Sequence, residues 1–390
     1  MGASQEEIKF FGLLVLKGHL RKEDVLRVLE KHAEESKKRC VSLADVAVSM
    51  GVIERSRLEH LKRVGGENLP EIPGLDILAK IGVGGSSVVF RAREKKTGRD
   101  VALKVMHEHL VNDEVGVKRF VTEAKLLIDF NHENIVKGLK LGTIQGNRLV
   151  FVMEFVDGDS LLDLLHKGNT FPEDAALYIV LQAARAIEYM RARGVLHRDI
   201  KPANLLLKRD NTVKLIDLGF ATSMAGALTE PHAAAGDTTL GTVHYISPEQ
   251  ARGQTDLDVR SDIYSLGATL YQLVLGKLPF EGSDNQEVLA RQILDSLSSS
   301  ELKSRQISPH MHYFIEKMMA KEREIRYQDP LELIADIEAQ IRGKKTLAYN
   351  PGAAAGSAEL LQKPYAEPDP EKARQDKARL DEIRRRRGLK

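Results

Sequence analysis

Two groups of polar residues have the types and the spacing that phosphoryl transfer would require. The first is the segment His197-Arg198-Asp199-Ile200-Lys201-Pro202-Ala203-Asn204, and the second is Asp217-Leu218-Gly219, thirteen positions after Asn204. Moving the γ-phosphoryl group of ATP to a hydroxyl needs one carboxylate to receive the hydroxyl proton and oxygen ligands to hold Mg²⁺. Either group alone is common on protein surfaces, but their order and spacing favour a shared catalytic role.

The sequence between the two groups predicts how they come together. Residues 205–207 are apolar, residues 213–216 are apolar except for Lys214, and a polar turn at 209–212 separates them, which is typical of a short β-hairpin. Both ends of such a hairpin would face one magnesium-bound ATP. The expected roles are Asp199 as the base, Lys201 as a phosphate contact, and Asn204 and Asp217 as metal ligands.

Composition limits the class of protein. The chain has 390 residues, of which 42% are hydrophobic and 29% charged, and this length suffices for a two-lobed domain with appendages. The net charge of +2 gives no electrostatic case for binding nucleic acid or a membrane. A single cysteine, Cys40, excludes an internal disulfide and fits a reducing compartment, and no apolar run is long enough to span a membrane. We expect a cytoplasmic protein.

Residues 1–65 have a helical pattern and a weak internal duplication. The segment Gly18–Val25 aligns with Gly51–Leu58 at a spacing of 33 residues, and an amphipathic helix follows each segment. The pattern predicts a pair of helical hairpins. Such a module would either dock a regulatory partner, whose identity the sequence does not give, or extend the packing of the next domain. Residues 66–74 are rich in Gly and Pro and predict a linker.

The next part of the chain contains a second set of candidates. Residues 81–90 are rich in glycine, which lets backbone N–H groups approach phosphates closely. Lys104 lies in the apolar strand-like segment 101–105, where it would supply a cation for phosphates. The segment 119–127 has helical periodicity, and Glu123 within it is the expected partner of Lys104. A glycine-rich hairpin or a solvated glutamate is the plainer interpretation of each feature alone.

Taken together, residues 75–342 resemble the eukaryotic-type (Hanks-type) serine/threonine protein kinases, and most closely their bacterial branch. The resemblance rests on the motifs above and on the segments 246–253 and Pro279-Phe280. It implies an α+β, bilobal fold with a small, mostly antiparallel β lobe carrying one helix and a larger, mostly helical lobe. A small all-α module at 1–65 would precede it.

The resemblance also implies roles for individual residues. Lys104 and Glu123 would form the ion pair of the active state, and residues 151–158 would be the hinge that meets adenine. The residues that it places around ATP are Gly82, Val83, Gly84, Gly85, Ser86, Ser87, Val89, Ala102, Lys104, Met153, Glu154, Val156 and Leu206. Ser87 stands at the third glycine position, a departure expected to stiffen the loop.

The segment between Asp217 and Glu249 resembles a kinase activation segment. Lys201 and the Gly241-Thr242 pair are similar to the serine/threonine class, and Thr242 would contact Asp199 and Lys201. Arg198 would need an anion, which phosphorylation of a loop hydroxyl would supply. Thr238 and Thr239 are the expected acceptors, unless the threonines of a flexible loop are incidental. Leu218, where Phe is commoner, and Ser247, where Ala is, are small departures.

The remaining implied roles are structural. Asp262 would accept hydrogen bonds from the backbone at His197 and Arg198, and Arg326 would pair with Glu249. Residues 343–390 are poor in bulky apolar residues and end in four arginines, which predicts a disordered linker and a charged tail.

The sequence thus favours a kinase that uses ATP and Mg²⁺, with Mn²⁺ as an alternative ion, to phosphorylate Ser or Thr hydroxyls of proteins. Its own activation segment would be among the substrates, and a homodimer would permit this reaction in trans. A pseudokinase scaffold is the leading alternative, but each acid, base and metal position is filled. A small-molecule kinase is disfavoured by the Gly241-Thr242 and Ser247-Pro248-Glu249 segments, which would form a peptide platform.

Overall fold

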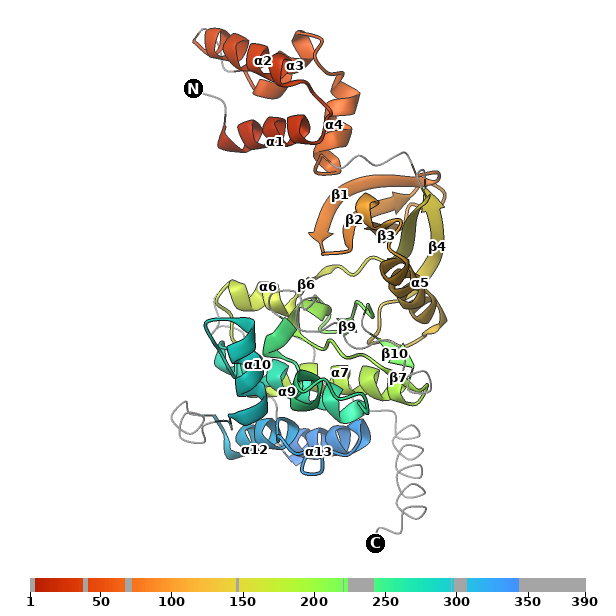
Figure 1. Ribbon diagram of the computed structural model, residues 1–390, viewed down its shortest axis with the longest axis vertical. Coiled ribbons are helices and arrows are strands. Elements are labelled where there is room, and N and C mark those ends of the chain that lie inside the picture. Colours follow the sequence, from red (N-terminus) through yellow and green to blue (C-terminus); the bar gives the residue numbers. More distant parts are fainter. Residues whose placement is uncertain are drawn as a thin grey trace.

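The computed structural model describes residues 4–37, 41–66, 72–144, 147–219, 221–223, 242–295, 297 and 307–343. Figure 1 shows three parts in succession along the long axis: the N-terminal helices at one end, a curved sheet with a helix beside it, and a larger helical lobe. Thr238, Thr239 and the tail from 344 to 390 lie outside the described residues. The α+β bilobal fold expected from the sequence is confirmed.

The N-terminal part contains α1 (Gln5–Leu16), α2 (Lys22–Glu35), α3 (Leu43–Ser49) and α4 (Arg55–Arg63). The ends of α1 and α3 are built alike. Gly18 and Gly51 have φ values of 73° and 68°, a conformation that glycine adopts without steric cost. The N–H groups of the next residues donate to the carbonyls of Leu14 and Ala47, at 2.8 and 3.0 Å. The C-terminal ends of α1 and α3 thus have the same local structure, at positions 33 residues apart in the sequence.

The N-terminal helices and the small lobe share one hydrophobic core. The buried side chains Leu14, Leu58 and Leu61 belong to the same apolar cluster as Phe90 and Leu103 of the sheet. At the junction, a Cβ added to Gly65 would lie 2.9 Å from the Lys80 side chain, so the end of α4 and strand β1 pass each other closely. Burial of apolar surface thus stabilises both parts together.

The small lobe is a five-stranded antiparallel sheet in the order β1-β2-β3-β5-β4. Side chains of adjacent strand residues point to opposite faces, so Val101, Leu103 and Val105 face the shared core while Lys104 faces the other way. Helix α5 (Glu114–Asp129), capped by the Asp113 side chain, contacts strand β4. The strands are β1 (Leu75–Val83), β2 (Ser87–Glu94), β3 (Asp100–Met106), β4 (Gly138–Ile144) and β5 (Arg148–Glu154).

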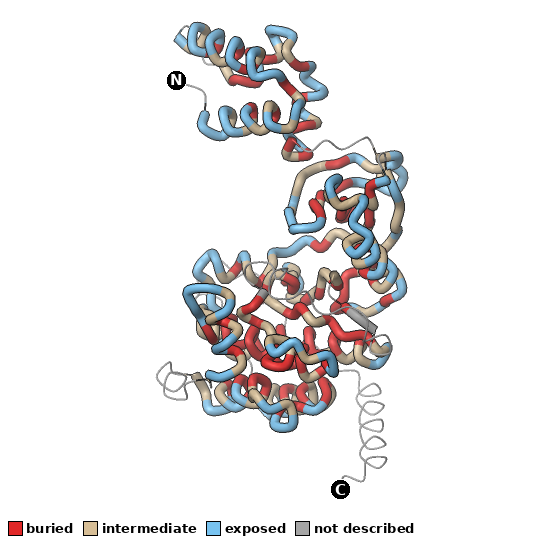
Figure 2. Tube along the Cα trace, in the orientation of Figure 1, coloured by how far each residue is buried: buried red, intermediate tan, exposed pale blue. Residues whose placement is uncertain are grey.

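The large lobe is built on two long buried helices, α7 (Glu173–Arg191) and α9 (Val259–Leu275), which appear as its red centre in Figure 2. A Cβ at Gly267 of α9 would lie 2.7 Å from Met318 Cβ, so the glycine lets α9 and α12 approach closely. The other helices are α6 (Leu161–His166), α8 (Pro248–Ala251), α10 (Asn285–Leu294), α12 (Pro309–Met318) and α13 (Pro330–Gly343). The 3₁₀ turns are Glu108–Leu110, Pro202–Asn204 and Thr242–His244.

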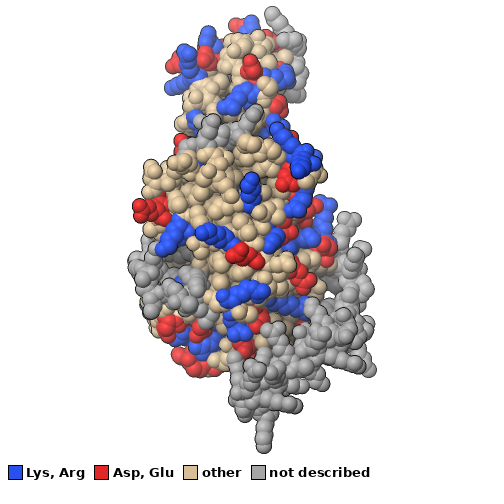
Figure 3. All heavy atoms as spheres, turned by 90° about the vertical axis from the view of Figure 1, so that its right-hand side faces the viewer, with Lys and Arg blue, Asp and Glu red and all other residues tan. Residues whose placement is uncertain are grey.

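The large lobe also contains short strands, which lie on its side nearest the small lobe (Figure 1). Strands β6 (Gly158–Ser160), β8 (Leu205–Lys208) and β9 (Val213–Leu215) form one sheet, and β7 (Val195–Leu196) pairs with β10 (Thr222–Ser223). The β8–β9 hairpin lies where the sequence predicts it. No helix among the described residues is long and apolar enough to cross a membrane. Positive and negative side chains are interspersed over the face shown in Figure 3.

Candidate active site

The loop between β7 and β8 holds Asp199 in a network of short contacts. The Lys201 ammonium lies 2.8 Å from Asp199 Oδ2, and the Asn204 side-chain amide donates to the same oxygen at 3.0 Å. The amide also donates to the Asp199 carbonyl at 2.9 Å, so loop and side chain are fixed together. Burial raises the pKa of Asp199, and the Lys201 ammonium opposes that shift. The carboxylate is thus both oriented and more basic than an exposed aspartate.

Asp262, near the start of α9, fixes the backbone of this loop. Its two carboxylate oxygens accept hydrogen bonds from the N–H groups of His197, at 2.9 Å, and Arg198, at 2.7 Å. Arg198 has a φ of 66°, which is uncommon for a residue with a side chain. Asp262 is buried, and this burial raises its pKa to about 6. Burial likewise lowers the pKa of His197 to about 4, which keeps that ring neutral.

The β8–β9 hairpin brings Asp217 to the same place. Ile216 N donates to the Asn204 carbonyl at 2.9 Å, which joins the two ends of the hairpin as the sequence predicts. Asp217 also has a positive φ, 63°, and its Oδ1 accepts a hydrogen bond from Gly219 N at 3.1 Å. Loss of hydration raises the pKa of Asp217, but the Lys104 ammonium and the Gly219 N–H more than offset this and lower it.

Lys104 of β3 connects the lobes. Its ammonium contacts both carboxylate oxygens of Glu123 on α5, at 2.6 and 2.7 Å, and lies 3.4 Å from Asp217 Oδ1. Burial lowers the pKa of Lys104, yet the carboxylates of Asp217 and Glu123 outweigh burial and raise it above its usual value. A permanent cation therefore lies between the α5 carboxylate and the candidate metal ligand.

The glycine-rich segment forms the turn between β1 and β2, and residues 83–86 are exposed. Gly84 N donates to the Ser87 carbonyl at 2.8 Å, and the His107 ring hydrogen-bonds the Gly84 carbonyl at 2.9 Å. Ser87 is buried and begins strand β2, so it lies beyond the turn rather than within it. A side chain at the third glycine position is accommodated there because an extended strand residue does not need glycine.

The hinge contains features that the sequence did not indicate. The side chain of Glu154 accepts hydrogen bonds from the Lys214 ammonium, at 2.7 Å, and from Lys137 N, at 2.8 Å. The Lys137 ammonium in turn donates to the carbonyls of Ile128 and Phe130 at the end of α5. Lys137 thus ties the segment 151–158 to α5. Nothing in the sequence marks Lys137, because the partners of its ammonium are backbone carbonyls.

The other nucleotide-contact candidates lie on the adjoining strands. Ala102 is paired with Met153 across β3 and β5, and Ala102 and Val156 are buried. Leu206 and Val89 are half-buried, which leaves part of each side chain accessible. Ala102 and Met153 thus lie close to Lys104 on the same pair of strands.

The donor set fits a hard divalent cation. Asn204 and Asp217 offer oxygen atoms from the two ends of one hairpin, and the Asp217 side chain is 44% exposed. Among the described residues, no three His, Cys, Asp or Glu side chains gather into a complete metal site. Mg²⁺ commonly takes one or two protein oxygens and completes its shell with phosphates and water, so this arrangement suits Mg²⁺ bound together with a nucleotide.

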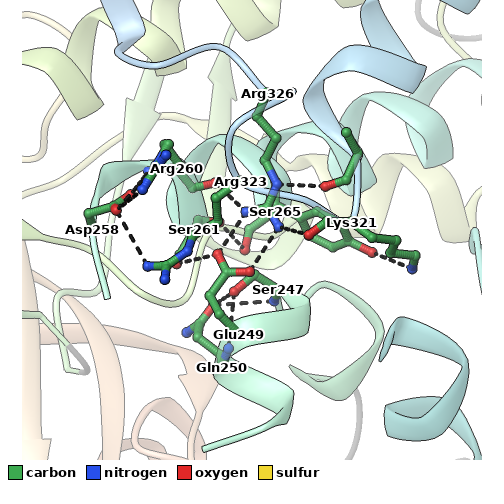
Figure 4. A network of polar contacts seen from close by, with 12 residues as sticks. Ser247, Glu249, Gln250, Asp258, Arg260, Ser261, Ser265, Lys321, Arg323 and Arg326 are labelled. Carbon is green, nitrogen blue, oxygen red and sulfur yellow. Dashed lines mark hydrogen bonds and ion pairs between the residues drawn. The ribbon is translucent and has the colours of Figure 1, made fainter. Parts of the chain in front are cut away.

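A network of polar contacts around Glu249 lies next to this site (Figure 4). Arg326 contacts both carboxylate oxygens of Glu249, at 2.7 and 2.8 Å, and Ser261 Oγ donates to Glu249 at 2.7 Å. Next to it, Ser247 and Gln250 form a capping box at the start of α8. The Gln250 side chain also donates to the Arg198 carbonyl at 3.1 Å, which links this network to the loop between β7 and β8 that holds Asp199, here called the catalytic loop.

Comparisons with known proteins agree with this geometry. The protein kinase domain family matches residues 75–335. The chain is 36% identical over 263 residues to a probable serine/threonine-protein kinase of Clostridium perfringens, covering 67% of this chain and 38% of the relative. It is 36% identical over 260 residues to the serine/threonine-protein kinase PknB of Mycobacterium leprae, covering 66% and 41% respectively. The chain thus spans about two fifths of the length of these curated relatives.

Proposed function

The chain belongs to the protein kinase family, in its bacterial serine/threonine branch, and from this premise we propose that it transfers the γ-phosphoryl group of ATP to Ser or Thr hydroxyls of proteins. ATP would enter with Mg²⁺, held by Asn204 and Asp217, in the cytoplasm, where ATP is available. The observation that carries the proposal is the continuous set of contacts from Glu123 through Lys104 to Asp217. This set joins the small lobe to the candidate metal ligand.

Each residue of the site has a separate task in this reaction. Asp199, oriented by Asn204 and made more basic by burial, accepts the proton of the acceptor hydroxyl. Lys201, 2.8 Å from Asp199, offers a cation close to the place where the phosphoryl group moves. Lys104 offers its charge to phosphate oxygens. The bound Mg²⁺ would supply further neutralisation of phosphate charge.

The alternative of a pseudokinase scaffold is not supported. A pseudokinase typically lacks one of the acid, base or cation positions, and here all of them are filled and mutually oriented. The polypeptide substrate class is supported by the ordered segment 242–247, which leads into α8, where Gln250 contacts the loop that holds Asp199. We also propose that the protein phosphorylates its own activation segment at Thr238 or Thr239, in trans within a homodimer, and that the N-terminal helices bind a regulatory partner.

The proposal is tested by incubating the protein with Mg²⁺ and labelled ATP, with Asp199→Asn as the matched control. The wild type is expected to incorporate label, and mapping is expected to find it on Thr238 or Thr239. Asp199→Asn keeps the shape of the side chain but removes the base, so it is expected to lose activity by roughly 10²–10⁴-fold. Bound ATP without incorporation into the protein or into any added polypeptide would contradict the proposed function.

A further inference from the structure

A half-buried lysine lies next to the residues that hold the segment 243–244, which would receive the substrate. Lys321 follows α12, and its ammonium donates to the Gln292 carbonyl at 2.6 Å and to the Tyr264 hydroxyl at 3.2 Å. It also lies 4.1 Å from the centre of the Phe280 ring, a cation–π contact. Within the described part of the chain, these partners are all neutral.

The partners of Lys321 hold the backbone of residues 243–244. Gln292, in the last turn of α10, is fully buried, and its side-chain amide donates to the His244 carbonyl at 2.7 Å and to the Val243 carbonyl at 3.3 Å. The Tyr264 hydroxyl donates to the side-chain oxygen of Gln292 at 2.6 Å, which orients that amide. Lys321 therefore holds Gln292 in two ways: directly, through the Gln292 carbonyl, and indirectly, through the Tyr264 hydroxyl that orients the Gln292 side chain.

A second connection runs through Phe280. Nδ1 of the His244 ring lies 3.2 Å from the Phe280 carbonyl, and the face of the Phe280 ring lies against the Lys321 ammonium. The segment 243–244 is thus held by Gln292 on α10 and by Phe280 in the preceding loop. Lys321 contacts both.

We propose that Lys321 is a positioning residue for the polypeptide substrate: it holds α10 and residues 243–244 together as one rigid surface beside the catalytic loop. This inference rests on the proposed function, because it assigns a task to the segment between Thr242 and Ser247. The ammonium is well placed for this task. It lies near the carbonyl end of α10, where a positive charge is favoured by the helix dipole.

The position of Lys321 is not explained by ordinary charge pairing. Burial lowers the pKa of Lys321 to about 7, while Asp295 raises it and the cations Arg326 and Arg252 lower it further. Burying an ammonium among neutral acceptors is unfavourable unless the contacts are good. A methionine of similar length would fill the same space and keep the contact with Phe280, but it would leave the Gln292 carbonyl and the Tyr264 hydroxyl without this donor.

The test compares Lys321→Met with Lys317→Met in the full chain. Lys317 is a matched control, since it is a half-buried lysine whose described partners are Tyr313, Tyr327 and Asp336. Lys321→Met is expected to raise the KM for a peptide substrate roughly 5–10-fold, the loss typical of one hydrogen bond. The KM for ATP and kcat are expected to stay within about twofold, and Lys317→Met is expected to change none of the three.

Amide hydrogen exchange gives a second readout that needs no activity. Lys321→Met is expected to quicken exchange in residues 242–246 and at the end of α10, and Tyr264→Phe to do so more weakly. If the wild type phosphorylates no polypeptide, the proposed function fails, and the exchange rates still decide whether Lys321 holds this surface. Unchanged exchange at 242–246, or an equal rise in both KM values, would overturn the positioning role.

Discussion

The Lys104–Glu123 pair of the small lobe and the Glu249–Arg326 pair of the large lobe are both buried, with side-chain exposures of 10% and 5% in the first and 2% and 0% in the second. They differ in the groups that the cation of each pair contacts besides its partner carboxylate. Arg326 donates to Glu249 and to the carbonyls of Ala320, Arg260 and Lys321, which occupies all five of its N–H donors. The large-lobe pair is saturated and has nothing left to bind.

The small-lobe pair is not closed in this way. Lys104 reaches a second carboxylate, Asp217, at 3.4 Å, so the local charge of the three groups is negative before a cation arrives. The comparison teaches that burial of an ion pair does not by itself indicate its role. A saturated pair stabilises the fold, whereas a pair with a further charged neighbour is prepared to respond to a ligand.

Removing Arg326 is expected to have the largest effect on stability. Arg326→Met leaves the Glu249 carboxylate buried without its cation, and such losses typically cost about 3–5 kcal/mol. The pKa of Glu249 would rise sharply, because Arg326 more than offsets the effect of burial that raises it. Denaturant unfolding measures the change. The double variant Glu249→Leu with Arg326→Met should recover part of the loss, and no recovery would contradict a charge-burial origin.

Removing Lys104 is expected to affect activity much more than stability. Lys104→Met should lower kcat/KM for ATP by roughly 10²–10³-fold, as for loss of one group that stabilises developing charge. Burial raises the pKa of Glu123 to about 7, so that carboxylate can take up a proton once its partner is gone. Steady-state kinetics and thermal unfolding on the same samples check this. If Lys104→Met lowered the stability as much as Arg326→Met does, the proposed difference in role between the Lys104–Glu123 and Glu249–Arg326 pairs would be wrong.

Lys321 offers an intermediate case, a half-buried cation without a carboxylate partner among the described residues. Its folded-state pKa of about 7 lies below its ordinary value of 10.5, so the folded protein binds fewer protons than the unfolded chain between these values. Its contribution to stability is therefore complete above the unfolded pKa and is lost as pH falls toward 7. The wild type should gain roughly 1 kcal/mol relative to Lys321→Met between about pH 6 and pH 9, after allowance for solvent contact.

Unfolding midpoints of both proteins at the two pH values provide the measurement. The charged groups around Lys321, namely Asp295, Arg326 and Arg252, are present in both proteins. A stability difference that is independent of pH would show that Lys321 is not titrating there.

The smallest effect is expected at an exposed ion pair of the small lobe. Arg93 and Arg91 hold the pKa of Asp100 at about 2, and Arg93 Nε lies 2.7 Å from its carboxylate. The pair's stabilisation is present above the unfolded pKa of 3.8 and is lost as pH falls toward 2. Asp100→Asn should therefore shift the unfolding midpoint only slightly at neutral pH, and less at high salt. If Asp100→Asn lowered the unfolding midpoint as much as Arg326→Met does, burial would not explain the difference between the Asp100 pair and the Glu249–Arg326 pair.

The sequence alone was enough to predict the bilobal fold and to identify the residues that the structure gathers around Asp199. Asp199, Lys201, Asn204 and Asp217 lie on one loop and one hairpin, so their spacing along the chain nearly determines their spacing in space. Their chemistry also requires particular side-chain types, which leave a visible pattern. The Lys104–Glu123 contact spans two elements, and it was predicted from the strand-like and helical patterns of these segments together with the family resemblance.

Other features were decided only by the tertiary structure. Lys321, Gln292, Gln250 and Lys137 act mainly on backbone carbonyls, and every residue has a carbonyl, so no sequence pattern reveals such a contact. The shared core of the N-terminal helices and the small lobe is similar, because apolar side chains show that a face is buried but not which partner covers it. Catalytic residues that lie on one loop or hairpin can thus be identified from the sequence. Contacts to backbone atoms and contacts between distant elements are determined only by the tertiary structure.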